Sequence, residues 1–494
     1  MGPSQVYRTS LALLTDFYQL TMAAAAWKGG VSGNEAVFHL SSRRNPFEGG
    51  YAVAAGLADA VDLLLHHEFT EDDRAFLAAQ VGSDGKPLFE PAFLDWLGDL
   101  RLDVDVDAVP EGTVVFPHEP LIRVRGPIVP CMLLETPLLA IVNFQTLIAT
   151  KAARTVLAAR GQPVVEFGLR RAQGIDGALS AARAAYIGGV AGTSNVLAGR
   201  LYGIPVKGTH AHSWVMLFDD EREAFLAYAR AMPANTILLV DTYDTLEGVR
   251  HAIEVGRWLA GEGHRLAGIR LDSGDLAWLS RQARAMLDAA GLADTAILAS
   301  NELDEHVIHA LQDQQAAIAI WGVGTRLVTG WGEPALGGVY KLSAVRDGPD
   351  LPWTYRVKLS EQLAKTTVPG IQQVRRYRHA EGFLADVIFD TGLGLPAAPE
   401  MVDPLDFTRR RVIPEGTPYE DLLVPVLRGG EPVWTPPPLA GSRSRAAAQL
   451  AQLHSGAKRL IHPHAYPVGL ERGLHDLRTR LVLEARARTP RRSP

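Results

Sequence analysis

The chain has 494 residues, of which 47% are apolar and 21% are charged, and its formal net charge is −6 at pH 7. This length predicts two or three structural units of globular composition, and the acidic balance argues against a nucleic-acid-binding protein, which usually carries a basic patch. The single cysteine, Cys131, excludes an intrachain disulfide and a cysteine-based metal site, as expected for a cytoplasmic protein.

We expect neither a secretory signal nor a membrane span. The first residues contain no apolar segment of the kind that secretory signals require. The most apolar stretch, residues 131–153, is interrupted by Glu135, Asn143 and Gln145. Because such groups are costly in a bilayer, this stretch is interpreted as a buried helix.

Residues 1–145 are expected to form an antiparallel-rich α+β domain. Apolar and polar residues alternate in the stretches 35–40, 101–109 and 121–126, as in strands with one buried face. Asp103, Asp105 and Asp107 alternate within one of these stretches, so we expect all three on one face, exposed to solvent.

Residues 146–345 are predicted to form an α/β barrel that carries the catalytic site. Short, nearly continuous apolar runs alternate there with helix-period segments, which favours a parallel sheet covered on both faces. Six such units favour a barrel over an open sheet. The predicted strands are residues 163–167, 204–209, 236–241, 266–272, 296–300 and 317–325.

Polar residues follow every predicted strand of the barrel. The residues are Glu166, Arg170, Arg171, His210, His212, Asp241, Asp244, Asp272, Asp275, Asn301, Glu302 and 322–326. In a barrel of parallel strands such residues gather at one face, where active sites form. The alternative is that they only begin loops and cap helices, but six consecutive strand ends of this kind favour a shared site.

The C-terminal third is predicted to add smaller parts to these two domains. Residues 346–440 are rich in proline and are expected to form an irregular, strand-containing segment packed on the N-terminal domain. Residues 441–485 are expected to be helical, and residues 486–494 to be a disordered basic tail. The predicted fold class is therefore α/β, an irregular α/β barrel with an N-terminal antiparallel-rich α+β domain and C-terminal additions.

Three motifs at the strand ends suggest chemistry. In "RLDSGD" (270–275), Arg270 suits a phosphate, and Asp272 with Asp275 suits ribose hydroxyls or hydrated Mg²⁺; the alternative is a helix N-cap at Asp272 or Ser273. The glycine-spaced "GVGTRL" (322–327) suits a phosphate, although it is not a Walker A sequence.

The third motif is "GTHAHSW" (208–214), with His210 and His212 one residue apart. The pair suggests metal ligands, a general base or core residues near a strand end. A metal site at this pair is disfavoured.

Several motifs, taken in order along almost the whole chain, resemble nicotinate phosphoribosyltransferase. They are "LLTDFYQLTMA" (13–23), "RRNPFEGGYAVAAGL" (43–57), "EFGLRRAQGIDGA" (166–178), "GTSNVLAG" (192–199), "GTHAHSW", "RLDSGDL" (270–276), "GVGTRLVT" (322–329) and "HPHAYPVGL" (462–470). The resemblance implies a type II phosphoribosyltransferase fold and a homodimer with shared active sites. It also implies transfer of phosphoribose from 5-phosphoribosyl-1-diphosphate to nicotinate in NAD salvage, with coupled ATP hydrolysis and Mg²⁺.

The same resemblance implies roles for individual residues. His212 is the histidine that ATP phosphorylates, and Asp272 is a second catalytic residue; the resemblance does not extend to His210, which we interpret as supporting. Tyr18, with Asp16, reaches the partner's site and stacks on the pyridine ring opposite Phe167. The remaining implied substrate-binding residues are Arg170, Arg171, Ser194, Ser213, Arg270, Ser273, Gly274, Gly322, Gly324 and Thr325. No direct protein ligand of Mg²⁺ is assigned.

Three other functions compete with this one. In nicotinamide phosphoribosyltransferase, of the same fold, an aspartate follows the Gly-Thr pair where this chain has Ser194, which favours the acid as substrate. Quinolinate phosphoribosyltransferase is a much shorter chain with a basic cluster for two carboxylates. A catalytically inactive, ligand-sensing relative is disfavoured by the intact Arg270, Asp272 and His212.

Overall fold

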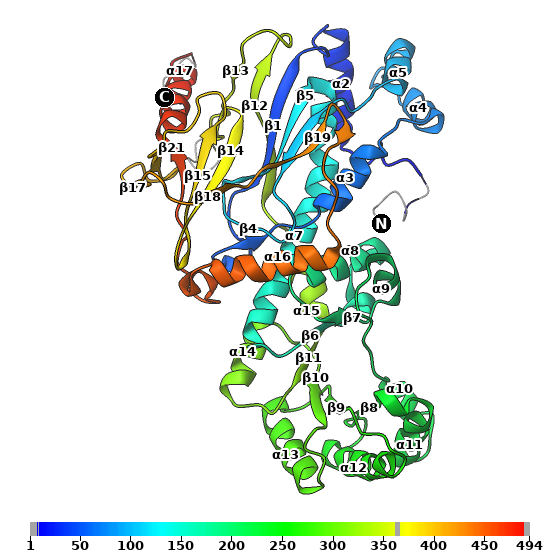
Figure 1. Cartoon of the computed structure of the whole chain (residues 1–494). Coiled ribbons are helices and arrows are strands. Elements are labelled where there is room, and N and C mark those ends of the chain that lie inside the picture. The colour runs from blue at the N-terminus through cyan, green and yellow to red at the C-terminus, as the bar shows by residue number, and fades with distance from the viewer. Residues whose placement is uncertain (1–6, 8, 361–365, 489–494) are drawn as a thin grey trace, which may run out of the picture. The chain divides into compact units, whose positions relative to one another are not determined.

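The structure of the protein is a computed structural model that describes residues 7, 9–360 and 366–488 (Figure 1). Two compact units make up the chain: residues 1–147 together with 335–494, and residues 148–334. Residues 346–440 and 441–485, which the sequence separates by composition, therefore belong to the same unit as the N-terminal residues.

The first unit contains a seven-stranded sheet in which all neighbouring strands are antiparallel, in the order β13-β12-β1-β5-β3-β19-β20. The strands are β1 Glu35–Ser42, β3 Asp105–Ala108, β5 Pro120–Pro127, β12 Gly338–Arg346, β13 Thr354–Tyr355, β19 Val424–Arg428 and β20 Glu431–Pro432. Three of the strands come from the predicted N-terminal domain, and its antiparallel character is confirmed. Strands β2 (Ala52–Val53) and β4 (Val114–Val115) form a separate pair.

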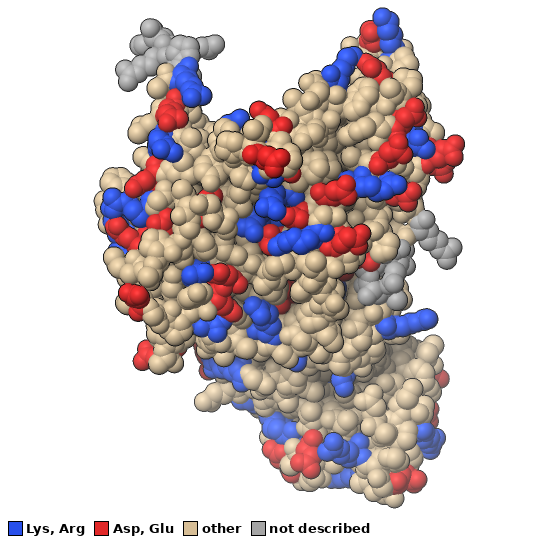
Figure 2. All heavy atoms as spheres, turned by 45° about the horizontal axis from the view of Figure 1, so that its top comes forward, with Lys and Arg blue, Asp and Glu red and all other residues tan. Residues whose placement is uncertain are grey.

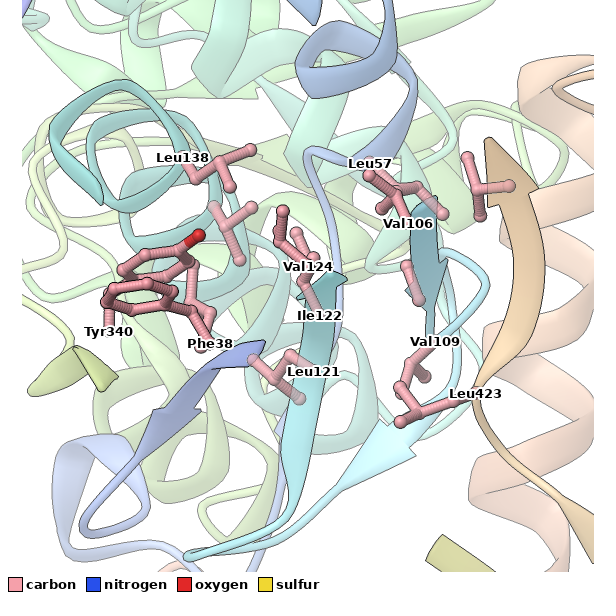
Figure 3. Packing of buried hydrophobic residues seen from close by; sticks show 14 of the residues in the cluster. Phe38, Leu57, Val106, Val109, Leu121, Ile122, Val124, Leu138, Tyr340 and Leu423 are labelled. Atoms are coloured by element: carbon pink, nitrogen blue, oxygen red, sulfur yellow. The ribbon is translucent and has the colours of Figure 1, made fainter. Parts of the chain in front are cut away.

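Apolar side chains from this sheet and its neighbouring helices form a large core cluster of the first unit (Figure 3). The rings of Phe38 on β1 and Tyr340 on β12 stack with their centroids 4.9 Å apart, and the Tyr340 hydroxyl donates to the carbonyl of Cys131 at 2.9 Å. The helices of this unit's N-terminal part are α2 Phe17–Lys28, α3 Leu57–Leu65, α4 Glu71–Ala78, α5 Pro91–Gly98 and α6 Ile128–Leu133; α7 Glu135–Ala158 begins there.

The aspartates at 105 and 107 correct one expectation. Asp105 lies opposite Arg125, and Asp107 opposite Arg123, in the β3–β5 ladder, and both pairs form salt bridges. Asp107 also pairs with Arg428 and is buried, with 6% exposure. Cross-strand arginines therefore take these carboxylates out of solvent. Elsewhere, basic and acidic residues intermingle over the face shown in Figure 2.

Five strands of the segment 346–440, which was expected to be irregular but strand-containing, lie in a second sheet of the first unit. Its order is β17-β16-β21-β15-β14-β18, with β14 Gln372–His379, β15 Gly382–Asp390, β16 Glu400–Val402, β17 Arg410–Val412, β18 Tyr419–Asp421 and β21 Val468–Glu471. The helices α16 Leu439–Gln452 and α17 Arg472–Arg488 follow the predicted helical character. Because α17 continues to Arg488, residues 486–488 are helical, while the rest of the predicted tail lies outside the described residues.

One helical stretch, Ile128–Ala158, is long and apolar enough to cross a membrane. Its most apolar window is 56% buried inside the protein, as in the core helix of a soluble protein. This agrees with the interpretation of residues 131–153 as a buried helix.

The second unit is built on a six-stranded parallel sheet with the order β7-β6-β11-β10-β9-β8. The strands are β6 Val164–Glu166, β7 Gly192–Thr193, β8 Ile237–Leu239, β9 Gly268–Leu271, β10 Ala296–Ala299 and β11 Ile320–Val323. The helices are α8 Gly174–Ile187, α9 Val196–Tyr202, α10 His212–Val215, α11 Glu221–Ala231, α12 Thr245–Gly261, α13 Leu276–Ala289, α14 Glu305–Asp313 and α15 Thr325–Val328. Strands and helices alternate as the barrel prediction requires.

The prediction of a strand at residues 204–209 is wrong. That segment forms only an isolated bridge, between Val206 and Thr193 of β7. Pro205 has no N–H group to donate to a ladder, although its carbonyl accepts from Thr193 N–H at 3.0 Å. Strand β7 itself was not predicted, because a two-residue strand is too short to show a periodic pattern.

Candidate active site

The carboxyl ends of the parallel strands bring together the residues of the "RLDSGD" motif and their neighbours. Arg270, on β9, donates through Nη2 to Asp272 Oδ1 at 2.9 Å and through Nε to Ser300 Oγ at 2.7 Å. Its Nη1 donates to Thr209 Oγ1 at 3.3 Å. The guanidinium is thereby fixed between the ends of β9, β10 and the 204–212 segment.

Asp272 is held in its ionised form. Partial burial raises the pKa of its carboxyl group, but the Ser300 hydroxyl, which donates to Oδ1, and the charge of Arg270 outweigh burial, so the net pKa is lowered. The carboxylate is therefore a fixed negative charge at the mouth of the barrel, suited to stabilise a cation that forms during a reaction.

His212 lies next to this carboxylate. It begins the short helix α10, and its Nε2 is 3.7 Å from Asp272 Oδ2. Its other ring nitrogen, Nδ1, is 3.1 Å from the Thr242 hydroxyl. The side chain is 40% exposed, so the ring is both oriented and accessible.

His210 lies apart from this open edge. Its ring is buried, and burial lowers its pKa to about 4, although the hydrogen bond with the carbonyl of Ala211 raises it. The two histidines of the motif therefore have different environments, one enclosed and one open.

Asp241, at the end of β8, is a site residue for which the sequence predicted no individual role. Its Oδ2 accepts from the backbone N–H of Asp272 and from the hydroxyl of Ser273, both at 2.7 Å. It therefore shapes the turn that carries Asp272, while its Oδ1 is buried and accepts no hydrogen bond from the described part of the chain. The signal available in the sequence was its place directly after a strand.

Asp272 and Ser273 do not cap a helix, contrary to the alternative considered from the sequence; the caps are provided by other aspartates. Asp275 accepts from Trp278 N–H and caps α13, and Asp244 accepts from Glu247 N–H and caps α12. Asp272 and Ser273 precede the cap of α13 and are free of that task. Gly274 lies between them and the cap with φ of +75°, a conformation that favours glycine.

Phe167 provides a partly buried aromatic platform directly after β6. Its ring lies 5.6 Å from the Arg270 guanidinium carbon and packs against Gly322, where a Cβ atom would stand 2.6 Å from the ring. The preceding Glu166 is buried, accepts from Gly168 N–H and the Thr193 hydroxyl, and has a pKa raised by burial. These contacts fix the turn that presents the ring.

Four further predicted residues lie at the same edge of the sheet. Arg170 and Arg171 are exposed on a short 3₁₀ helix, Leu169–Arg171, and pair with no carboxylate in the described part of the chain. Ser194 follows β7, and its N–H donates to the carbonyl of Glu166 at 2.9 Å, which places it beside Phe167. Ser213 is exposed, next to His212.

The glycine loop after β11 completes this edge. Gly324 lies against the backbone of Phe167, and a Cβ atom at residue 324 would stand 3.2 Å from the Phe167 carbonyl oxygen. Thr325 begins α15, and its hydroxyl donates to Glu302 Oε1 at 3.1 Å. The loop is therefore adjacent to the aromatic platform.

Asp16 and Tyr18 belong to the first unit and not to the barrel. Asp16 precedes α2 and accepts a hydrogen bond from the Thr136 hydroxyl at 2.8 Å. Tyr18, in the first turn of α2, is 48% exposed. Its phenol is therefore available on the surface of that unit.

Among residues 7, 9–360 and 366–488, no three His, Cys, Asp or Glu side chains converge as a metal cluster. Mg²⁺ does not need such a cluster, because it commonly binds one or two carboxylates together with substrate phosphates. Asp272, together with the Oδ1 atom of Asp241, offers oxygen donors of that class.

Three family models match the chain in succession. They are the nicotinate phosphoribosyltransferase N-terminal domain over residues 13–143, the nicotinate phosphoribosyltransferase family over 163–349 and the corresponding C-terminal domain over 372–478. Each match covers one part of the chain, and they follow the order in which the motifs were found.

Full-length relatives carry the same name. The chain is 39% identical to nicotinate phosphoribosyltransferase of Bacillus subtilis over 486 residues, covering 97% of this chain and 96% of the relative. It is 43% identical to that of Mycobacterium tuberculosis over 468 residues, covering 93% and 97%. The crystal structure of human nicotinic acid phosphoribosyltransferase superposes with a TM-score of 0.82 at 34% identity, covering 95% of this chain and 100% of the human one. The chain therefore belongs to the nicotinate phosphoribosyltransferase family.

Proposed function

We propose that the protein is a nicotinate phosphoribosyltransferase of NAD salvage. It joins nicotinate to 5-phosphoribosyl-1-diphosphate, giving nicotinate mononucleotide and diphosphate. The observation that carries the proposal is the cluster at one edge of the sheet, where the Arg270–Asp272 ion pair, His212 and the Phe167 platform lie together. The inactive-relative alternative does not account for so complete a set of oriented groups.

The residues divide the reaction between them. The nicotinate ring stacks on Phe167, and its carboxylate pairs with Arg170 or Arg171, whose charges have no carboxylate partner in the described part of the chain. The pyridine nitrogen attacks C1 of the ribose as the bond to diphosphate breaks, and the cationic ribose that develops is stabilised by Asp272. The loop at Gly322, Gly324 and Thr325 binds the 5′-phosphate.

ATP enters as a co-substrate that phosphorylates His212. When Nδ1–H donates to Thr242, the lone pair of Nε2 is free to attack the γ-phosphorus, and the bond to ADP breaks. Ser213, which follows His212, and Ser273 and Gly274, which follow Asp272, bind substrate phosphates or ribose. Mg²⁺, when bound through Asp272 and Asp241, would neutralise the charge of the departing diphosphate.

A homodimer with shared sites fits the exposed apolar residues. Around the carboxyl edge of the second unit's sheet, five large apolar side chains are each at least 66% exposed; they are Ile175, Val196, Met216, Leu217 and Tyr243. A second copy that covered these side chains would remove them from water, which is favourable. We propose that a second copy covers it and contributes Tyr18, with Asp16 beside it, to the pyridine site, and that the enzyme is cytoplasmic.

Steady-state assays of the purified protein with nicotinate and nicotinamide test the proposal. Nicotinamide lacks the carboxylate that would pair with Arg170 or Arg171, so it leaves this cationic pocket unpaired. We therefore expect kcat/KM for nicotinate to exceed that for nicotinamide by roughly a hundredfold or more. Ser194→Asp places a negative charge beside Phe167 and should lower kcat/KM for nicotinate much more than for nicotinamide. Ser194→Ala, which adds no charge, is the control. Equal kcat/KM values for the two substrates in the wild-type protein would contradict the assignment.

A further inference from the structure

One gap in the hydrogen bonding of the barrel points to an unassigned role for His210. Strands β7 and β8 are the two edges of the sheet. On the outer side of β7, Thr193 donates to the carbonyl of Pro205 and accepts from the N–H of Lys207, which binds the 204–212 segment to this edge. In the described part of the chain, no ladder joins that segment to β8. The N–H groups of successive strand residues point to opposite sides of the strand. The N–H of Val240 points toward β9 and donates to the carbonyl of Arg270, so the N–H of Leu239 points away from β9.

The imidazole of His210 fills this gap. The N–H of Leu239 donates to His210 Nε2 at 3.1 Å, between residues that are both buried. A side chain thus supplies the acceptor that a neighbouring strand would normally supply. Through this contact the 204–212 segment binds the backbone of β8.

The same contact fixes the tautomer of the ring. A backbone N–H can only donate, so Nε2 must be unprotonated, and Nδ1 carries the proton and donates to the carbonyl of Ala211 at 3.3 Å. The ring lies against Tyr228, with centroids 4.8 Å apart, and 6.1 Å from the ring of Phe225. Its low pKa agrees with a ring that remains neutral.

The Ala211 carbonyl links this ring to His212. It accepts from His210 Nδ1 and also from the N–H of Trp214 at 3.0 Å, which forms the first turn of α10. Thr209, which precedes His210 in the sequence, accepts a hydrogen bond from Arg270 through its hydroxyl. The backbone on both sides of His210 is therefore tied to the site.

We infer that His210 is a positioning residue: its neutral ring binds the backbone of β8 through one nitrogen and the Ala211 carbonyl through the other, and so holds His212 beside Asp272. With its Nε2 lone pair occupied and its ring buried, His210 is not itself a phosphoryl acceptor. The inference deepens the proposed function, since it rests on phosphorylation of His212.

Two variants separate the hydrogen bond from the volume of the ring. His210→Gln retains an acceptor that reaches Leu239 N–H, whereas His210→Phe retains an aromatic ring against Tyr228 but accepts nothing. Single-turnover phosphorylation with γ-labelled ATP is measured at several ATP concentrations, and the labelled peptide is mapped. For His210→Phe we expect the rate constant of phosphorylation to fall by about tenfold or more, because the acceptor is displaced, with the half-saturating ATP concentration unchanged. His210→Gln should recover most of that rate, and the label should map to His212 in every case.

The outcomes separate loss of positioning from loss of ATP coupling itself. Equal phosphorylation rates in His210→Phe and the wild type, or label on His210, would overturn the inference while leaving ATP coupling intact. A wild type that takes up no label would instead overturn the proposed coupling. Should His210→Phe not fold, ¹⁵N resonances of histidine in the wild type provide the readout: an Nδ1–H tautomer at His210 supports the inference, and an Nε2–H tautomer refutes it.

Discussion

Replacing Gly322 by alanine tests whether the Phe167 platform governs binding of the pyridine ring. A Cβ atom at residue 322 would stand 2.6 Å from Cε2 and 2.7 Å from Cδ2 of Phe167. Because non-bonded carbon atoms settle at about 3.5–4.0 Å, the ring must move by roughly 1 Å. The buried strand β11, on which residue 322 lies, cannot yield easily, so the half-buried ring is the part that moves.

A displacement of this size near reacting groups costs roughly a hundredfold in rate, and overpacking costs about 1–3 kcal/mol of stability. For Gly322→Ala we expect kcat/KM for nicotinate to fall by about that factor, with KM for nicotinate affected more than KM for 5-phosphoribosyl-1-diphosphate. The assay is the initial rate of nicotinate mononucleotide formation, with thermal melting of the same samples.

Two companion variants make the reasoning refutable. Adding Phe167→Leu removes the clash, so the double variant should regain melting temperature without regaining activity. Gly177→Ala, in α8, meets no atom within 4 Å and should leave activity unchanged. If Gly322→Ala retains the wild-type kcat/KM and melting temperature, the argument that the missing Cβ makes room for the ring is wrong.

Three other perturbations test the remaining parts of the account. His212→Ala should take up no phosphate from labelled ATP and lose ATP stimulation while keeping slow phosphoribosyl transfer; undiminished stimulation would contradict phosphorylation at this residue. Mixing inactive Tyr18→Ala and Asp272→Ala subunits should restore activity, because one hybrid site receives both intact residues, and none should return if each subunit acts alone. The pKa of His210 is lowered from 6.5 to about 4 in the folded protein, so between these pH values the unfolded chain binds more protons than the folded one. The folded state is therefore destabilised, by about 3 kcal/mol in total, as the pH falls from 6.5 toward 4. Urea unfolding across this range should show a steeper loss in the wild type than in His210→Gln; equal slopes would contradict a buried neutral ring.

The barrel and the positions of most candidate-site residues could be predicted because their signals are local. Each apolar run from β8 to β11 is followed within a few residues by a residue of the candidate site, as with Asp272 after β9 and Gly324 after β11. Parallel strands then bring those ends to one edge without further information. The same locality explains the failure at 204–209, where an apolar run resembles a strand but Pro205 interrupts its donors.

Contacts between residues far apart in the chain could not be predicted in this way. Strand β15 pairs in parallel with β21, so Asp386 lies beside Val468, and no periodicity in either segment reports that pairing. The burial of Asp107 depends on Arg123 across the ladder and on Arg428 much later in the chain. Likewise, the acceptor role of His210 toward Leu239 depends on how the barrel closes and not on the spacing within its motif.

The short distances at the barrel edge give a physical reason for ATP to influence pyridine binding. The proposed phosphorylation of His212 would add about two negative charges next to Asp272, whose carboxylate is ionised and lies 3.7 Å from Nε2. Like charges at that separation repel strongly in a partly buried site, so a cation must be drawn in, either Mg²⁺ with its diphosphate or the guanidinium of Arg270. Arg270 also lies over the ring of Phe167, 5.6 Å from its centroid. A shift of the guanidinium toward a phosphoryl group on His212 would therefore alter the Phe167 platform, so under the proposed mechanism the added charge would reach both substrates.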